Sequence, residues 1–97
     1  MIQVHDTFVC KPGNASKIAK MTKEHMKNMP GHKAVLTDMT GQFHRVIIIS
    51  EYEDFTAYQK SWEAMANPTP EMKEAMKDFA EFQSMYTSGS REIYKVW

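Results

Sequence analysis

The chain has 97 residues, 42% hydrophobic and 25% charged, and this composition is typical of one folded domain rather than a disordered segment. Twelve basic residues balance twelve acidic ones, which argues against a general electrostatic affinity for nucleic acid or anionic membranes. The longest apolar run, Val46–Ile49, is far too short to cross a bilayer, and the single Cys10 has no second cysteine for an internal disulfide. We therefore expect one soluble, cytoplasmic domain over residues 1–97.

The first half of the chain predicts a strand followed by an amphipathic helix. Residues 2–10 are rich in β-branched and aromatic side chains and stop at Pro12-Gly13, as a strand before a turn does. Asn14 is a suitable N-cap for a helix from Ala15 to about Met29, which Pro30-Gly31 ends. At 100° per residue, one apolar face of this helix collects Ile18, Met21, Thr22, His25 and Met29.

The stretch MTKEHMKNMPGHK, residues 21–33, raises the question of a soft metal site, because thioether and imidazole groups both bind copper(I). The helical stripe accounts for most of these side chains, and Pro30-Gly31 separates His32 from the rest. His5 and His44 also lack acidic or cysteine neighbours at the spacing of metal ligands. We expect no metal site.

Two further strands follow as a hairpin, over residues 32–40 and 43–52, with Gly41-Gln42 as a short turn between them. The second is apolar on both faces. One face is predicted to carry Phe43, Ile47 and Ile49, and the other Val46, Ile48 and Tyr52.

The last part of the chain predicts a broken helical segment and a final strand. Glu53-Asp54 offers an N-cap for a helix from Phe55 to about Asn67, and Thr69 and Pro70 start another. One side of this third helix is predicted to carry Met72, Ala75, Met76, Phe79, Gln83 and Tyr86. Ser88-Gly89-Ser90 ends the helical region, and Arg91–Trp97 is predicted to be a strand.

The element order predicts an α+β, ferredoxin-like βαββαβ domain, with a four-stranded antiparallel sheet covered by helices on one face. The second face of such a sheet is normally polar and exposed to solvent, whereas the strand over residues 43–52 is apolar on both faces. The simplest cover for the second face is the sheet of an identical copy, so we expect a homodimer.

Four stretches resemble the dimeric α/β-barrel superfamily, over nearly the whole chain: KPGNASKI, LTDMTGQFHRVIIISEYED, SWEAMANPTP and SGSREIYKVW. Within it, the chain is most similar to uncharacterised NIPSNAP-like and antibiotic-biosynthesis-monooxygenase-like proteins. The resemblance implies a dimeric α/β barrel with a small-molecule pocket between the helices and sheet of each subunit. These motifs indicate a fold more than a reaction.

The heme-degrading and quinone-forming monooxygenases of this group use no conventional flavin or metal cofactor. The resemblance implies roles for an asparagine in the first strand, a tryptophan in the second helix and, for heme, a histidine in the following helix. Trp62 matches the tryptophan, Asp6 stands at the asparagine position, and residues 71–77 contain no histidine. Heme is therefore disfavoured, because Met72 and Met76 offer only thioethers.

Each candidate site residue also has a structural explanation. Asp6 is a candidate general base, or else the ion-pair partner of Arg45 or Arg91. His25, the second catalytic candidate, could instead be a hydrogen-bonded core histidine. The residues predicted to line the pocket, some of which could simply be core, are Tyr58, Trp62, Met72, Met76, Tyr86 and Arg91.

The sequence thus predicts a small homodimer that binds an apolar or aromatic small molecule without a cofactor. Its enzymatic form is a cofactor-independent monooxygenase. The alternative is a non-catalytic binding or interaction module, and heme binding or degradation is a third, less favoured hypothesis. Nucleotide-dependent and classical hydrolytic chemistry are not expected, since no phosphate loop, nucleophile elbow or HExxH motif is present.

Overall fold

The computed structural model describes residues 1–77 and 82–97, with no side chains described at 72, 75–77, 82 and 83. Its elements follow one another in the order β1 (Ile2–Cys10), α1 (Ala15–Met26), β2 (His32–Thr37), β3 (Arg45–Tyr52), α2 (Phe55–Ala66), α3 (Pro70–Lys77), α4 (Phe82–Met85) and β4 (Tyr86–Lys95). The strands form one four-stranded sheet in the order β2-β3-β1-β4. Every neighbouring pair is antiparallel. The predicted α+β, ferredoxin-like fold is confirmed.

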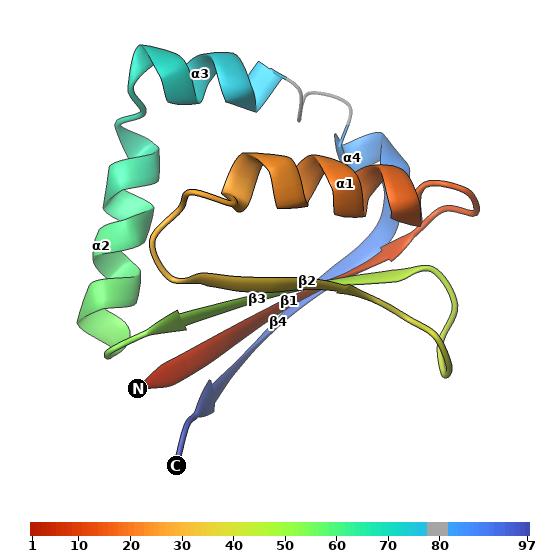
Figure 1. Ribbon diagram of the computed structural model, residues 1–97, viewed down its shortest axis with the longest axis horizontal. Coiled ribbons are helices and arrows are strands. Elements are labelled where there is room, and N and C mark those ends of the chain that lie inside the picture. Colours follow the sequence, from red (N-terminus) through yellow and green to blue (C-terminus); the bar gives the residue numbers. More distant parts are fainter. Residues whose placement is uncertain (78–81) are drawn as a thin grey trace.

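The described helices, α1 to α4, lie on one side of the sheet (Figure 1). The core is thin and lies between α1 and the two central strands, where Val4, Ile18 and Val46 are at most 2% exposed. Ile18 comes from the predicted apolar face of α1, and Val4 and Val46 come from the helix-facing sides of β1 and β3. Helix α1 is thus held to the sheet by apolar burial.

The ends of α1 differ from the prediction. Asn14 lies in the helical region of the backbone and makes no side-chain cap hydrogen bond. The helix also ends at Met26 rather than near Met29, because the chain must turn early to start β2. Gly31 makes this turn with φ +86°, and a Cβ there would lie 2.7 Å from the carbonyl oxygen of Glu51. Only glycine fits both the conformation and the space.

The hairpin between β2 and β3 is longer than the short turn predicted at Gly41-Gln42. Residues 38–44 form a loop whose ends are joined by the Arg45 amide, which donates to Asp38 Oδ1 at 2.7 Å. The Arg45 side chain donates to the carbonyl oxygens of Gln42 and Thr40, so it serves this loop. Phe43 consequently lies outside the strand and is 76% exposed, in contrast to its predicted place on a sheet face.

The N-cap of α2 is confirmed, since Asp54 Oδ1 accepts from the Ala57 amide at 2.8 Å. The predicted continuous third helix is wrong at its end, because α4 stops at Met85 and β4 begins at Tyr86. Tyr86 is therefore a strand residue, and so is Gly89. The backbone of β1 offers pairing partners here, with Cys10 opposite Tyr86 and a register shift beside it. The predicted position of Phe79 lies outside the described residues.

The second face of the sheet carries no helix from residues 1–77 or 82–97 (Figure 1). Val46, Ile48 and Ser50 are buried on the helix side, so the alternating Ile47 and Ile49 point to the other face. Leu36 of β2, the Cα partner of Ile47, is 44% exposed there. The prediction that β3 is apolar on both faces is confirmed for the residues within the strand. None of the described helices is long and apolar enough to cross a membrane.

Candidate functional site

Asp6 and Arg91 form an ion pair on the helix-facing side of the sheet. Asp6 lies in the middle of β1 and is the Cα partner of Arg91 on β4. Arg91 Nε donates a hydrogen bond to Asp6 Oδ1 at 2.5 Å. The Asp6 side chain is 23% exposed and that of Arg91 is 42% exposed, so solvent reaches the pair. This is one of the two ion pairs considered for Asp6, and Arg45 is occupied elsewhere.

Arg91 also lies against an aromatic side chain of α2. Its guanidinium carbon is 4.8 Å from the centre of the Trp62 ring, within the range of a cation–π contact. The hydrogen bond to Asp6 raises the pKa of Arg91 above its ordinary value, against the lowering effect of partial burial. Arg91 thus carries a positive charge whose guanidinium is held through Nε by the Asp6 carboxylate and lies against the Trp62 indole.

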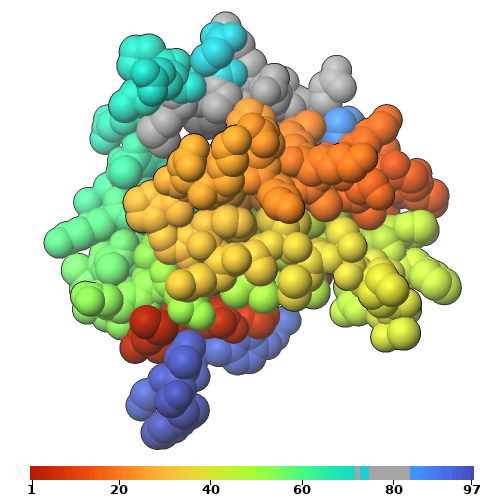
Figure 2. All heavy atoms as spheres, in the orientation of Figure 1, coloured from red at the N-terminus to blue at the C-terminus, as the bar shows by residue number. Residues whose placement is uncertain are grey.

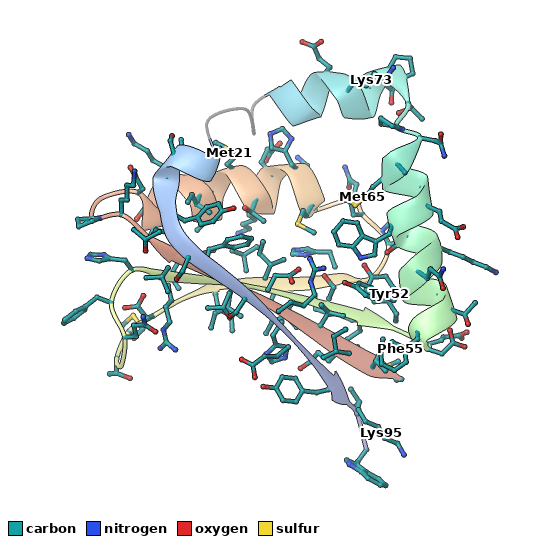
Figure 3. All side chains as sticks on the ribbon, turned by 180° about the vertical axis from the view of Figure 1, so that it is seen from behind. Met21, Tyr52, Phe55, Met65, Lys73 and Lys95 are labelled. Carbon is teal, nitrogen blue, oxygen red and sulfur yellow. The ribbon has the colours of Figure 1, made fainter. Side chains whose placement is uncertain are left out.

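The indole belongs to a short row of aromatic rings between α2 and β3. The Trp62 and Tyr58 rings are 6.3 Å apart and meet edge to face. The Tyr58 and Tyr52 rings are 5.2 Å apart. Tyr52 lies in the angle between the sheet and α2 (Figure 3). This row forms an aromatic wall beside Arg91, as the four-residue spacing of Tyr58 and Trp62 predicted.

A hollow of about 350 Å³ opens beside the ion pair. The residues that line it come from β1 and from the first half of β4: Asp6, Phe8, Tyr86, Gly89, Ser90 and Arg91. The Phe8 and Tyr86 rings, with centres 4.9 Å apart and planes tilted by 60°, give it an apolar end, while Asp6 and Arg91 give it a charged end. A hollow with an apolar surface and a few polar groups is typical of small-molecule sites.

Gly89 shapes this hollow by having no side chain. It is the Cα partner of Phe8, and a Cβ at this position would be 3.3 Å from the Phe8 ring. The sequence does not predict Phe8, Gly89 and Ser90 as site residues, because its local pattern puts Gly89 in a break after a helix. A glycine inside a strand is itself a signal of a close approach or an open space, and it could have identified the position.

The predicted site residues fare differently in the structure. Asp6, Tyr86 and Arg91 line the hollow, Trp62 contacts Arg91, and Tyr58 contacts Trp62. His25 is half-buried on α1 and is not among the residues that line the hollow. The two predicted methionines lie on α3, but their side chains fall outside the described part of the structure: Met72 and Met76.

The described residues contain no group of three or more histidine, cysteine, aspartate or glutamate side chains that could hold a metal ion. His44 lies in the hairpin loop with φ +64°, whereas His5 is on β1 opposite Ile49. The His5 ring instead contacts Gln3 Oε1 at 2.6 Å and Tyr94 at 4.9 Å between ring centres. These two histidines therefore do not meet across the sheet.

No protein-family model matches the chain, and no curated protein matches its sequence. Solved structures do match its fold. A NIPSNAP domain protein from Burkholderia xenovorans superposes with a TM-score of 0.80 at 13% identity, covering 100% of this chain and 95% of that one. The chain has the fold of the NIPSNAP domain proteins.

Two further structures extend the comparison. A NIPSNAP family protein from Agrobacterium tumefaciens gives a TM-score of 0.79 at 11% identity, with 97% of this chain and 90% of that chain covered. A proposed antibiotic biosynthesis monooxygenase from Deinococcus radiodurans gives 0.62 at 14% identity, covering 100% and 93%. At these identities the likeness to NIPSNAP proteins establishes a shared fold, and the function must be argued from the site.

Within this NIPSNAP fold, the site joins the two ends of the chain. Strand β1 supplies Asp6 and the last strand supplies Arg91, and the two strands are hydrogen-bonded neighbours. Helix α2 then brings Trp62 over the pair. The fold thus assembles an anion, a cation and an indole from three separate segments.

Proposed function

We propose that this protein binds an aromatic small molecule that carries an acidic oxygen, such as a phenol or an enol, in the hollow beside Arg91. The observation that supports this most directly is the position of the Arg91 guanidinium. Its Nε is held by Asp6, while neither terminal nitrogen has a hydrogen-bond partner among the side chains and backbone that the structure describes. Two donors on one planar group suit an anionic oxygen or a carboxylate.

The apolar part of the ligand would lie against the aromatic side chains. Phe8 and Tyr86 line the far end of the hollow, and Trp62 stands over the guanidinium. Aromatic rings favour offset or edge-to-face contact with another ring, which gives about 1 kcal/mol beyond simple burial. A volume of about 350 Å³ suits a ligand with two or three fused rings.

In the enzymatic form of the proposal, Asp6 accepts a proton from the ligand and Arg91 holds the oxygen that becomes negative. Molecular oxygen is the oxidant. An activated CH₂ group then reacts with O₂ to give a carbonyl group, and the second oxygen atom leaves as water. No metal or flavin is required by this balance. The role predicted for His25 stays a prediction, because it does not line the hollow.

The proposal includes a homodimer formed through the open face of the sheet. Ile47 and Ile49 are half-buried on this face, and Leu36 beside them is 44% exposed. Burial against the same face of a second copy would remove this apolar surface from water. A cytoplasmic location is also part of the proposal, since Cys10 is a buried free thiol that suits a reducing compartment.

Binding of 1-naphthol, followed by its fluorescence, tests the ligand site. We expect saturable binding to the wild type and at least a tenfold loss in Arg91→Gln. The matched control is Lys95→Gln, which removes a positive charge from the same face of β4, away from the hollow, and should retain binding. Wild-type binding that Arg91→Gln leaves unchanged would overturn the proposal. Because Arg91→Gln leaves Asp6 without its partner, Asp6→Asn/Arg91→Gln should be measured with it.

Oxidation separates the enzymatic form from the non-catalytic alternative. Incubation of the protein with anthrone and O₂ should produce anthraquinone at a rate that Asp6→Asn lowers at least a hundredfold. Binding without any such rate enhancement would identify a binding module instead. Added hemin should show no shifted Soret band, since the described residues offer no histidine beside the hollow.

A further inference from the structure

A second hollow, of about 460 Å³, lies at the opposite edge of the sheet, between α1 and the outermost strand β2. Its lining includes three lysines and a histidine, and it shares no residue with the hollow beside Arg91: Lys23, Lys27, His32, Lys33, Ala34 and Val35. Helix α1 (orange) lies directly against β2 (yellow) on the face shown in Figure 2. The two segments thus bring basic side chains together from both sides of this hollow.

Positive charge is in excess here, although the chain as a whole is neutral. None of the lining residues is acidic. Lys27 is paired with Glu24 at 2.8 Å, and Lys33 lies 3.8 Å from Glu51. For Lys23, no carboxylate partner lies within the described ranges 1–77 and 82–97.

The spacing of two of these lysines is unfavourable. Lys23 and Lys27 are four residues apart on α1, so their ammonium groups are neighbours on one helical face and repel each other, and the ion pair with Glu24 offsets this repulsion only in part. Lys33 approaches the same hollow from β2. An anion placed among the three groups would convert this repulsion into attraction.

His32 provides an observation independent of charge. Its Nδ1 is buried and has no hydrogen-bond partner among the described residues. A buried polar atom without a partner loses its hydrogen bonds to water and gains none in return, so it destabilises the folded state. His32 lines the hollow, so a rotation of its ring toward an anion bound there would let a protonated Nδ1 donate a hydrogen bond and gain the partner that the described residues do not supply.

A purely structural explanation covers only half of this cluster. Lys23 lies in the last turn of α1 and Lys27 is its C-cap residue, where positive charge stabilises the exposed carbonyl groups of a helix end. That effect does not explain Lys33 or His32, because both belong to β2. The 3.8 Å contact with Glu51 accounts in part for Lys33, whereas the buried Nδ1 of His32 is left without a structural explanation.

We propose that this basic hollow binds the phosphate group of a small phosphate ester. Phosphate, with its double negative charge, would compete with Glu24 and Glu51 for Lys27 and Lys33 and would attract Lys23 more strongly than a singly charged carboxylate does. Ala34 and Val35 complete the lining and offer an apolar surface to the organic part of the ester. This site acts independently of the proposed ligand site, because the two hollows share no residue.

Titration of the ¹⁵N-labelled protein with phenyl phosphate, and in parallel with inorganic phosphate, tests this proposal by NMR. We expect saturable shifts of the amide signals of Lys23, His32 and Lys33, together with a shift of the His32 Nδ1 resonance. The variant Lys23→Gln/Lys33→Gln should bind at least tenfold more weakly. The control Lys17→Gln/Lys20→Gln removes the same charge from exposed positions of α1 and should bind within twofold of the wild type.

Two outcomes would overturn the proposal. Non-saturating shifts that sodium chloride reproduces would show general ionic attraction only, and equal weakening in both double variants would show an effect of net charge. A parallel binding experiment with vesicles containing phosphatidic acid distinguishes a lipid headgroup from a soluble phosphate ester as the source of the phosphate group. Binding to these vesicles, but to neither soluble phosphate, with loss in Lys23→Gln/Lys33→Gln alone, would assign the same chemistry to a lipid headgroup.

Discussion

Asp6 and Arg91, 85 positions apart in the sequence, are joined by a hydrogen bond of 2.5 Å between adjacent strands of the sheet. The pair links the helix-facing side of β1 to β4, the last strand. It also fixes the orientation of the guanidinium under Trp62. This relationship gives the protein both a structural contact and a candidate site.

A double-mutant cycle on Asp6→Ala and Arg91→Ala should give a coupling energy of about 1 kcal/mol or less, since solvent screens a partly exposed pair. The pKa of Arg91 is raised above its ordinary value, chiefly by the hydrogen bond to Asp6, so the contribution of Arg91 to stability is present at all lower pH values and is lost only as pH rises through the folded-state pKa. Urea unfolding at pH 6 and pH 9 should therefore give the same Arg91 contribution. A clear fall in the Arg91 contribution between pH 6 and pH 9 would contradict the raised pKa of Arg91.

Gly89→Val should fill the hollow while leaving the fold intact. The new side chain would enter the space beside Phe8, whose ring lies 3.3 Å from the position of an added Cβ. Because of this crowding, we expect the free energy of unfolding to fall by about 1 kcal/mol. Binding of 1-naphthol should fall at least tenfold. Ser88→Val is the control, because it places the same side chain on the other face of β4. Equal binding by both variants would show that the ligand does not use this hollow.

Ile49→Glu should prevent dimer formation, because it places a charge on the open face of the sheet. Light scattering coupled to size exclusion should find the wild type as a dimer at micromolar concentration and the variant as a monomer. Phe43→Glu is the control: Phe43 is 76% exposed in the hairpin loop, outside the sheet, and should leave the dimer intact. A monomeric wild type would refute the dimer.

Thr22→Val should stabilise the protein by about 1 kcal/mol. Thr22 is 1% exposed, and its Oγ1 has no hydrogen-bond partner within the described part of the chain. Replacing a buried, unsatisfied hydroxyl by a methyl group of similar size removes its desolvation cost. The free energy of unfolding in urea measures the change. The control Ser16→Val, at an exposed position of α1, should bring no such gain, and a destabilised Thr22→Val would reveal a hydrogen bond to that hydroxyl.

Local sequence signals predicted the order of the elements well. Strand β1 was predicted at its observed bounds, and Asp54 was identified as the N-cap of α2. The errors lie where tertiary contacts override local preference. Strand β4 begins at Tyr86 because the backbone of β1 is available for pairing, although the local pattern favoured a helix there.

The sequence by itself determined the ferredoxin-like topology, because the alternation of strand and helix periods is a local property of the chain. It also narrowed the partner of Asp6 to two arginines. Only the tertiary structure chose Arg91 and placed Trp62 over it, since strand register and helix position decide which distant side chains meet. The open space at Gly89 and the basic hollow were likewise decided by packing, because a cavity is defined by several segments at once and by none of them alone.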